Sequence, residues 1–250
     1  MISIISFKIL MKFFFEENLD KIYYGFFEFL NFMKKILFIF LMSFSVNLFA
    51  QYLTVEKSNL YMAKNYSYLL TIDDFDKSLM KMHITLYEGY VNNVNLRIDQ
   101  LDKIDSSSRL SKALKKTFAF EFDGMKLHEL YFDNLKQDIK INRKSKFYKK
   151  IEEQFESFDT WINDFKNTGM IRGIGWVILY FDVNEKRFFN AWIDEHQINH
   201  LIECVPILVM DVFEHAYLTQ FGLNRKKYID IFFKNINWYE VSKRYEKVIK

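Results

Sequence analysis

The fold follows from the stretch Pro206-Ile-Leu-Val-Met-Asp-Val-Phe-Glu-His-Ala-Tyr217, in which a short apolar run ends in an acid and a histidine. The apolar run predicts a buried strand. Asp211 and His215 are four residues apart, which is about one helical turn, so both side chains can point the same way from a strand-to-helix junction. One carboxylate oxygen and one imidazole nitrogen then face one metal ion. The stretch therefore predicts half of a metal site.

The composition indicates a folded chain with a sizeable core. Of the 250 residues, 50% are hydrophobic and 19% are aromatic, enough for one large domain or two small ones that share an interface. The net charge of +3 comes without a dense Lys/Arg tract, which argues against a nucleic-acid partner. The single cysteine, Cys204, excludes an internal disulfide and a cysteine-based zinc cluster. We expect Cys204 to be a small core residue.

Residues 1–50 differ from the rest of the chain. Met33-Lys34-Lys35, the apolar run Ile36–Phe49 and the small residue Ala50 have the order of a bacterial secretory signal peptide. The apolar run of about 14 residues is short for a membrane span. We expect translation to begin at Met33 and the protein to be exported to the periplasm or secreted. The competing interpretation is an uncleaved amphipathic segment that anchors the protein to a membrane.

The next region, 51–135, is predicted to be a helical hairpin domain. Apolar residues recur there at spacings of three and four. Lys77–Leu101 and Leu110–Leu135 predict two helices joined by a turn at the serines 106–108. His83 and His128 each lie on the apolar side of their helix. A lone histidine in such a place is usually a core residue, but two on facing helices are candidate metal ligands.

The last region, 136–250, is predicted to be an α/β domain. Glycines punctuate the turn Gly169–Gly175, which lacks the Lys-Ser/Thr of a phosphate-binding loop, and no Gly-x-Ser-x-Gly nucleophile motif occurs. The whole chain is thus expected to be α+β, with a helical hairpin followed by a small three-stranded antiparallel sheet. The expected elements are a connector at 136–155, a helix at Phe155–Asn167, strands at Trp176–Phe181, Arg187–Ile193 and Ile207–Met210, a helix that carries His215 and Tyr217, and a helix at Tyr228–Ile236.

Four motifs, in order along the chain, resemble the iron/manganese superoxide dismutases. His83-Ile-Thr-Leu-Tyr-Glu-Gly-Tyr-Val-Asn-Asn-Val-Asn95 and Gly124-Met-Lys-Leu-His-Glu-Leu-Tyr-Phe-Asp-Asn-Leu135 are similar to the two helices of that family that carry ligands. Gly173-Ile-Gly-Trp-Val-Ile-Leu179 and Asp211-Val-Phe-Glu-His-Ala-Tyr217, followed by Tyr228 and Asn237-Trp238, resemble its C-terminal domain. The resemblance covers roughly residues 57–247.

The resemblance implies one iron or manganese ion per subunit and no organic cofactor. Its protein ligands would be His83, His128, Asp211 and His215, a nitrogen and oxygen set without thiolate that suits either metal. A shift of one residue relative to well-known family members leaves Met82 as the alternative to His83. We prefer His83 because a thioether is a poor ligand for a hard, redox-cycling ion.

The resemblance also implies roles around the metal. Tyr90 would guard the substrate channel, Trp176 would form part of an aromatic wall, and His196 would hydrogen-bond the bound solvent. Arg225 would attract the superoxide anion near the channel mouth. Glu214 would reach a ligand histidine across the interface of a homodimer.

Three further residues, Leu86, Leu218 and His200, differ from the pattern of common family members. Leu86 and Leu218 match a histidine and a tyrosine that pair across the dimer in common family members, so both partners are apolar here. His200 has no counterpart in the motifs, and we expect it at the surface.

The resemblance implies an antioxidant oxidoreductase that converts superoxide to oxygen and hydrogen peroxide. The alternative is a catalytically inactive relative that serves as a metal-binding or envelope interaction protein, and a third reading is a membrane-tethered helical scaffold. Gly124 favours manganese, or activity with either metal, whereas His196 is compatible with iron or with either metal.

Overall fold

The computed structural model describes residues 28–30, 32–45 and 60–249. Contacts divide the chain into two compact units, Met1–Leu60 and Tyr61–Lys250. In the first unit, the described residues 28–30 and 32–45 are helical, with exposed apolar side chains such as Phe38 and Ile39. No helix among the described residues combines the length and the apolarity needed to cross a membrane. The proposed cleavage point at Ala50 lies outside the described residues.

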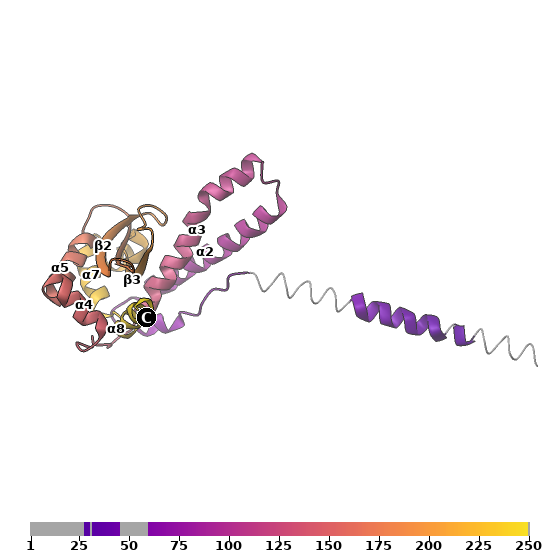
Figure 1. Ribbon diagram of the computed structural model, residues 1–250, viewed down its shortest axis with the longest axis horizontal. Helices are drawn as coiled ribbons and strands as arrows, with labels where there is room; N and C mark the ends of the chain where they lie inside the picture. Colours follow the sequence, from indigo (N-terminus) through magenta and orange to yellow (C-terminus); the bar gives the residue numbers. More distant parts are fainter. Residues whose placement is uncertain (1–27, 31, 46–59, 250) are drawn as a thin grey trace, which may run out of the picture. The chain divides into compact units, whose positions relative to one another are not determined.

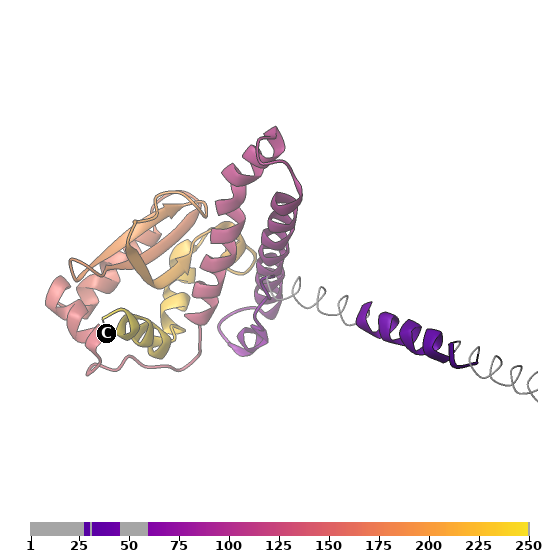
Figure 2. The same ribbon diagram turned by 45° about the vertical axis from the view of Figure 1, so that its right-hand side comes forward.

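The second unit begins with a helical hairpin. A 3₁₀ turn, η1 (Ser67–Thr71), precedes the long helices α2 (Lys77–Lys103) and α3 (Arg109–Asp133), which lie side by side in both views (Figures 1 and 2). Ser108 caps α3, since its side chain accepts a hydrogen bond from the backbone N–H of Ser111 at 3.1 Å. The predicted hairpin and its serine turn are therefore present, with helix bounds that differ by about two residues.

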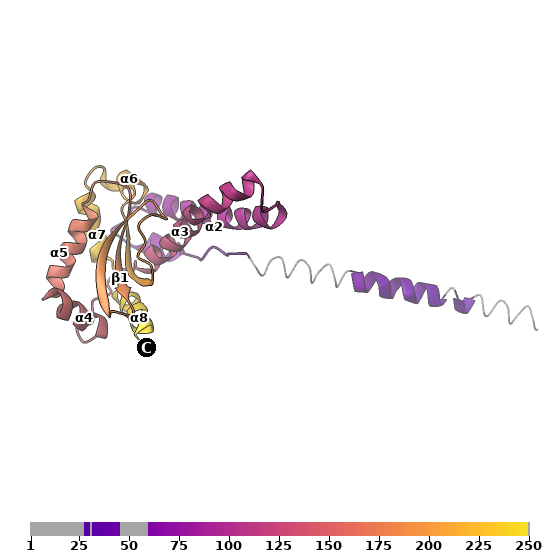
Figure 3. The same cartoon turned by 45° about the horizontal axis from the view of Figure 1, so that its top comes forward.

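The rest of the unit is a sheet with helices around it. Figure 3 shows α4 and α5 on one side of the strands and the hairpin of α2 and α3 on the other. The remaining elements are α4 (Lys146–Phe155), α5 (Phe158–Gly169), β1 (Gly175–Asp182), β2 (Arg187–Asp194), β3 (Cys204–Asp211), η2 (Glu214–Ala216), α6 (Leu218–Phe221), α7 (Arg225–Lys234) and α8 (Trp238–Val248).

The three strands form one antiparallel sheet in the order β2-β1-β3, which confirms the predicted fold class. The central strand β1 is buried over almost its whole length, as its unbroken apolar run requires. The register between β1 and β3 shifts where Tyr180 faces Pro206. Proline lacks the N–H that a regular ladder needs, so a shift there on an edge strand is expected.

The structure corrects two predictions about the elements. The expected connector at 136–155 contains the helix α4. Ser145 caps this helix, and its side chains Phe147 and Ile151 are buried. The expected helix at His215 and Tyr217 is a single 3₁₀ turn, η2, followed by the four-residue helix α6. The helix α8 was not predicted. In each case, the hydrophobic period is too short or too diluted by charge to give a clear signal.

Candidate metal centre

Four side chains from four elements meet between the hairpin and the sheet. His83 lies on α2, His128 on α3, Asp211 at the end of β3 and His215 on η2. One ligand atom from each lies within 4.8 Å of all the others. The Nε2 atoms of His83, His128 and His215 are 3.2, 3.8 and 3.0 Å from Oδ2 of Asp211. All but His215 are fully buried.

The sheet explains why Asp211 lies beside Trp176. Antiparallel pairing puts the start of β1 next to the ends of β2 and β3, so Trp176 faces Asp211 and Gly175 faces Asp194. The backbone N–H of Phe213 donates to Oδ1 of Asp211 at 2.8 Å, which leaves Oδ2 for the cluster. The Tyr228 hydroxyl donates to the backbone carbonyl of Asp211 at 2.6 Å. The carboxylate is therefore fixed before any ion binds.

A hydrogen bond also fixes the ring of His128. Its Nδ1 donates to the backbone carbonyl of Gly124 at 2.6 Å, so the neutral ring has its lone pair on Nε2. Nε2 is buried and has no hydrogen-bond partner among the residues that the structure describes. A buried polar atom without a partner is costly, and here it points at the other three ligand atoms. The residues present therefore fit a cation.

The protonation states of the cluster suit the same cation. Burial lowers the pKa of His83 and lowers that of His128 well below its usual range, so both rings are neutral ligands. Burial would raise the pKa of Asp211, but the imidazoles of His215 and His83 outweigh it and the net pKa is well below the usual range. Although burial lowers the pKa of His215, the Asp211 carboxylate raises it more. The cluster thus favours a positive charge beside Asp211.

Trp176, His196 and Tyr90 form a hydrogen-bonded chain next to the cluster. The indole N–H of Trp176 donates to Nδ1 of His196 at 3.1 Å. Because an indole nitrogen only donates, the proton of neutral His196 is on Nε2, which donates to the hydroxyl oxygen of Tyr90 at 2.7 Å. Burial lowers the pKa of His196 to about 4 and raises that of Tyr90 to about 12. Tyr90 therefore keeps its own proton and does not give it to His196.

Gly124 makes room for this chain. A Cβ atom there would lie 2.9 Å from the ring of Tyr90 and 3.2 Å from Cδ2 of His196. Such distances require the neighbouring rings to move. The glycine, four residues before His128, therefore allows Tyr90 and His196 to meet over α3.

The structure also places the remaining predicted residues. The side chain of Met82 is 46% exposed, whereas the neighbouring His83 is buried. Arg225 donates to the backbone carbonyls of Ile171 and Gly173 at 2.8 and 2.7 Å and lies over the ring of Tyr217. Among the described residues, the hydrogen bonds of Arg225 go to this turn and to Tyr217 rather than to the four ligands.

Comparison with known proteins agrees with this geometry. Residues 143–244 match the family model of the C-terminal domain of iron/manganese superoxide dismutases. The chain is 36% identical to the iron superoxide dismutase of Aquifex pyrophilus over 172 residues, which cover 66% of this chain and 80% of the relative. It is 30% identical to the manganese superoxide dismutase of Haloarcula marismortui over 171 residues, or 67% of this chain and 83% of the relative. The chain belongs to the iron/manganese superoxide dismutase family.

The family model covers only two of the four candidate ligands. The C-terminal family model contains Asp211 and His215, whereas His83 and His128 precede it. The iron superoxide dismutase of Pyrobaculum aerophilum, 27% identical over 172 residues that cover 67% of this chain and 82% of the relative, extends the same similarity. His83 is one of the four residues whose ligand atoms converge and is 1% exposed, whereas Met82 is 46% exposed.

Two features near the superoxide dismutase centre were missed from the sequence. His200 is only partly exposed, and it hydrogen-bonds the backbone of His196 and the hydroxyl of Tyr180. Its spacing of four from His196 was the available signal. Glu121, buried on α3, accepts from Arg97 and Asn93 of α2 at 2.7 and 3.0 Å. Its partners lie 24 and 28 residues earlier, so no local pattern shows the pair.

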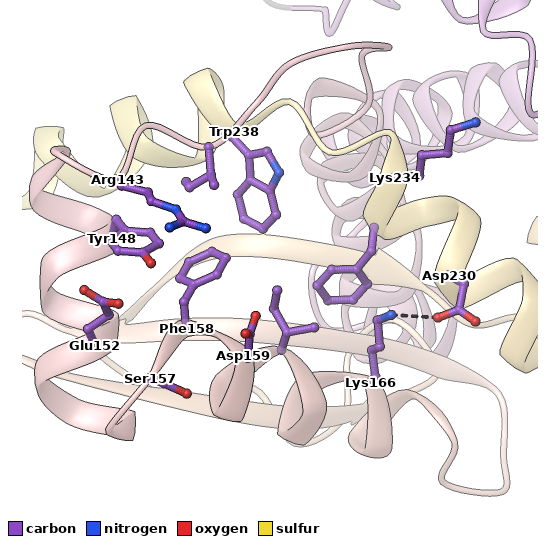
Figure 4. A pocket seen from close by; sticks show the side chains of 13 residues that line it. Arg143, Tyr148, Glu152, Ser157, Phe158, Asp159, Lys166, Asp230, Lys234 and Trp238 are labelled. Carbon is purple, nitrogen blue, oxygen red and sulfur yellow. Dashed lines mark hydrogen bonds and ion pairs between the residues drawn. The ribbon is translucent and has the colours of Figure 1, made fainter.

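A surface pocket of about 530 Å³ lies elsewhere, between α4, α5, α7 and α8 (Figure 4). Tyr148, Phe158 and Trp238 line it, and Lys166 on its wall pairs with Asp230 at 2.6 Å. None of the four ligand residues lines this pocket. It is therefore separate from the metal centre.

Proposed function

We propose that this chain is a superoxide dismutase that holds one iron or manganese ion between His83, His128, Asp211 and His215. The observation that carries the proposal is the buried cluster of four ligand atoms within 4.8 Å of one another, in a chain of that family. An ion with two accessible oxidation states supplies the electron exchange by which two superoxide anions and two protons become one oxygen and one hydrogen peroxide.

Tyr90 and His196 support the supply of those protons. His196 donates to the Tyr90 oxygen, so the Tyr90 proton is free to be offered to the substrate side. Trp176 holds His196 in the tautomer that this requires. Because the pKa of His196 is lowered to about 4 by burial, the ring remains neutral and the direction of the chain is the same across the neutral range. The role of this chain is to hold a proton at Tyr90 and to keep the Tyr90 hydroxyl turned towards the substrate side.

Arg225 provides positive charge for an anionic substrate. Its hydrogen-bond partners among the described residues are two backbone carbonyls and a tyrosine hydroxyl. No carboxylate among them cancels its charge. A fixed cation of this kind raises the local concentration of an anion such as superoxide.

A homodimer through the Glu214 region is part of the proposal. Glu214 is exposed and directly precedes the ligand His215, and Leu218, one turn further, is 42% exposed although it is apolar. An exposed leucine beside a metal ligand is better covered by a second copy than by water. Sedimentation of the wild-type protein and of Leu218→Asp tests this, since a shared interface there predicts dissociation of the variant into monomers.

Export is proposed on the basis of the N-terminal pattern. The described helix at 32–45 is apolar and carries Lys34 and Lys35 near its start, as in a signal peptide. The N-terminal sequence of the mature protein recovered from the envelope of an expressing bacterium decides between cleavage after Ala50 and an uncleaved anchor.

The function is tested by loading one preparation with iron and another with manganese. The expected result is about one ion per chain and, with at least one metal, superoxide turnover far above that of the free ion. Bound metal without such turnover would replace this proposal with the inactive relative, and the absence of bound metal would show that the cluster is only a core.

A further inference from the structure

His196 lies in a loop whose backbone is unfavourable by itself. The loop joins β2 to β3, and three of its residues, Glu195, Asn199 and Glu203, have φ values of 50°, 71° and 63°. Residues other than glycine rarely adopt this left-handed region. Neighbouring contacts must therefore hold the loop in place, and with it the ring that donates to Tyr90.

One group of contacts ties the loop to the end of β2. The indole N–H of Trp192 donates to Oδ1 of Asp194 at 2.7 Å, and the side-chain amide of Asn199 donates to Oδ2 at 2.7 Å. The backbone N–H of Ile198 donates to the carbonyl of Asp194 at 3.3 Å. These bonds close the loop at its base but do not touch the backbone of His196.

His200 supplies the contact that reaches the backbone carbonyl of His196, whose N–H donates to Oε1 of Gln197 at 3.3 Å. Its Nε2 lies 2.7 Å from the backbone carbonyl oxygen of His196, which can only accept, so Nε2 is the donor. Nδ1 of the neutral ring then accepts from the Tyr180 hydroxyl at 2.7 Å. Tyr180 is 2% exposed and belongs to β1, the central strand. The loop carbonyl is thereby tied, through one imidazole, to the buried central strand of the sheet.

The donor at each end of this link is well defined. Burial raises the pKa of the Tyr180 hydroxyl well above its usual value, so it remains a donor. Asp123 on α3 lies 3.9 Å from Nε2 of His200 and is the nearest acid. The link from Tyr180 to His200 to the His196 carbonyl uses no group of the four-ligand cluster.

We propose that His200 is a positioning residue, which holds the backbone of His196 so that its ring meets Trp176 and Tyr90. The effect of His200 on turnover rests on the proposed function of the centre. Its effect on the loop does not. Without His200, the loop is free to relax, and the His196 ring no longer donates to Tyr90 in every molecule. Proton transfer then slows, while the four ligands and the bound ion are unchanged.

The test compares four variants of the full-length, metal-loaded protein. His200→Ala removes the link. His200→Gln restores a donor, because the glutamine amide nitrogen occupies nearly the place of Nε2. Tyr180→Phe removes only the hydroxyl and keeps the buried ring. Ile202→Ala is the control, since this side chain in the same loop is 91% exposed.

Hydrogen exchange at the amides of residues 195–200 and superoxide turnover are measured for each. We expect His200→Ala to raise exchange by about tenfold and lower turnover by about three- to tenfold, the size of one hydrogen bond. Tyr180→Phe should act in the same direction but less, His200→Gln should return both values to within about twofold of wild type, and Ile202→Ala should match wild type.

Unchanged exchange and turnover in both His200→Ala and Tyr180→Phe would overturn the proposal, as would a failure of His200→Gln to restore either value. If His200→Ala does not fold, Tyr180→Phe and His200→Gln decide between these outcomes. A wild-type protein that binds metal without turnover would refute the function, but the exchange result would still test the role of His200 in the loop.

Discussion

Two of the four ligand side chains, His128 and Asp211, are oriented by a backbone contact outside the metal pocket. The backbone of Gly124 accepts from Nδ1 of His128, and the N–H of Phe213 donates to Asp211. Such contacts fix ring and carboxylate orientation and raise metal affinity. At the scale of single residues, the centre is therefore pre-organised by the backbone as much as by the ligands.

The neighbours Met82 and His83 give the sharpest substitution test. We expect His83→Ala to lose most of the bound metal and all measurable turnover, because one of four protein ligands is missing. Met82→Ala should keep one ion per chain, since the Met82 side chain is 46% exposed. Metal content by elemental analysis checks both. Loss of metal in Met82→Ala with retention in His83→Ala would reverse the ligand assignment.

The buried ring of His196 predicts a pH dependence of stability. Its pKa is lowered to about 4 in the folded chain from 6.5, so between these values the unfolded chain binds a proton that the folded chain does not. The free energy of unfolding is then complete above about pH 6.5 and falls as the pH drops towards about 4.

We expect His196→Gln to lose less stability than wild type over this window, by on the order of 1–2 kcal/mol. Urea unfolding of chelator-treated protein between pH 7 and pH 4.5 measures the difference. Parallel curves would mean that His196 is not held neutral by the fold.

At the scale of elements, the close approach of β1 and β2 at one end of the sheet determines where the site residues lie. Gly175 has a φ of 148°, and a Cβ atom there would overlap the backbone carbonyl of Ile193. Only glycine lets β1 and β2 approach at this point. That approach brings Trp176 opposite Asp211 and starts the loop of His196 beside both.

We expect Gly175→Ala to destabilise the protein by about 3 kcal/mol or more, since backbone must move to admit the methyl group. Gly89→Ala is the matched control, because a Cβ on this α2 glycine meets nothing within 4 Å. The control should gain about 0.5–1 kcal/mol of helix stability. Denaturant midpoints of both variants check the prediction, and equal destabilisation would contradict the close approach.

The sequence predicted those elements that have a clear period or an unbroken apolar run. The hairpin helices and the three strands were found in this way. The helix α4 was taken for a connector because lysines and glutamates surround its few buried residues, such as Phe147. The resemblance supplied the ligand types, but His200 was expected at the surface, since its partner Tyr180 lies on β1 and reaches it only in the folded sheet.

At the scale of the whole molecule, the centre joins parts of the chain that are far apart. His83 and Asp211 are separated by 128 positions, and their side chains are 3.2 Å apart. An ion at this point links α2, α3, β3 and η2. Binding to the folded state alone stabilises it by mass action.

Removal of the metal should therefore lower the melting temperature by about 10 °C, the effect of about 4 kcal/mol on a unit of this size. Differential scanning calorimetry with and without a chelator measures the change. The His83→Ala protein serves as the control and should melt at one temperature under both conditions. A wild-type melting temperature that ignores the chelator would show that the ion does not link these elements.

The hydrogen bond between Tyr228 and Asp211 bears on when, during synthesis, the set of ligands can form. Tyr228 of α7 donates to the Asp211 carbonyl, so the complete ligand set exists only after nearly the whole chain has left the ribosome. A chain that is still being synthesised, or one threaded unfolded through a membrane, has no place to keep an ion. The ion is therefore taken up where the chain finishes folding.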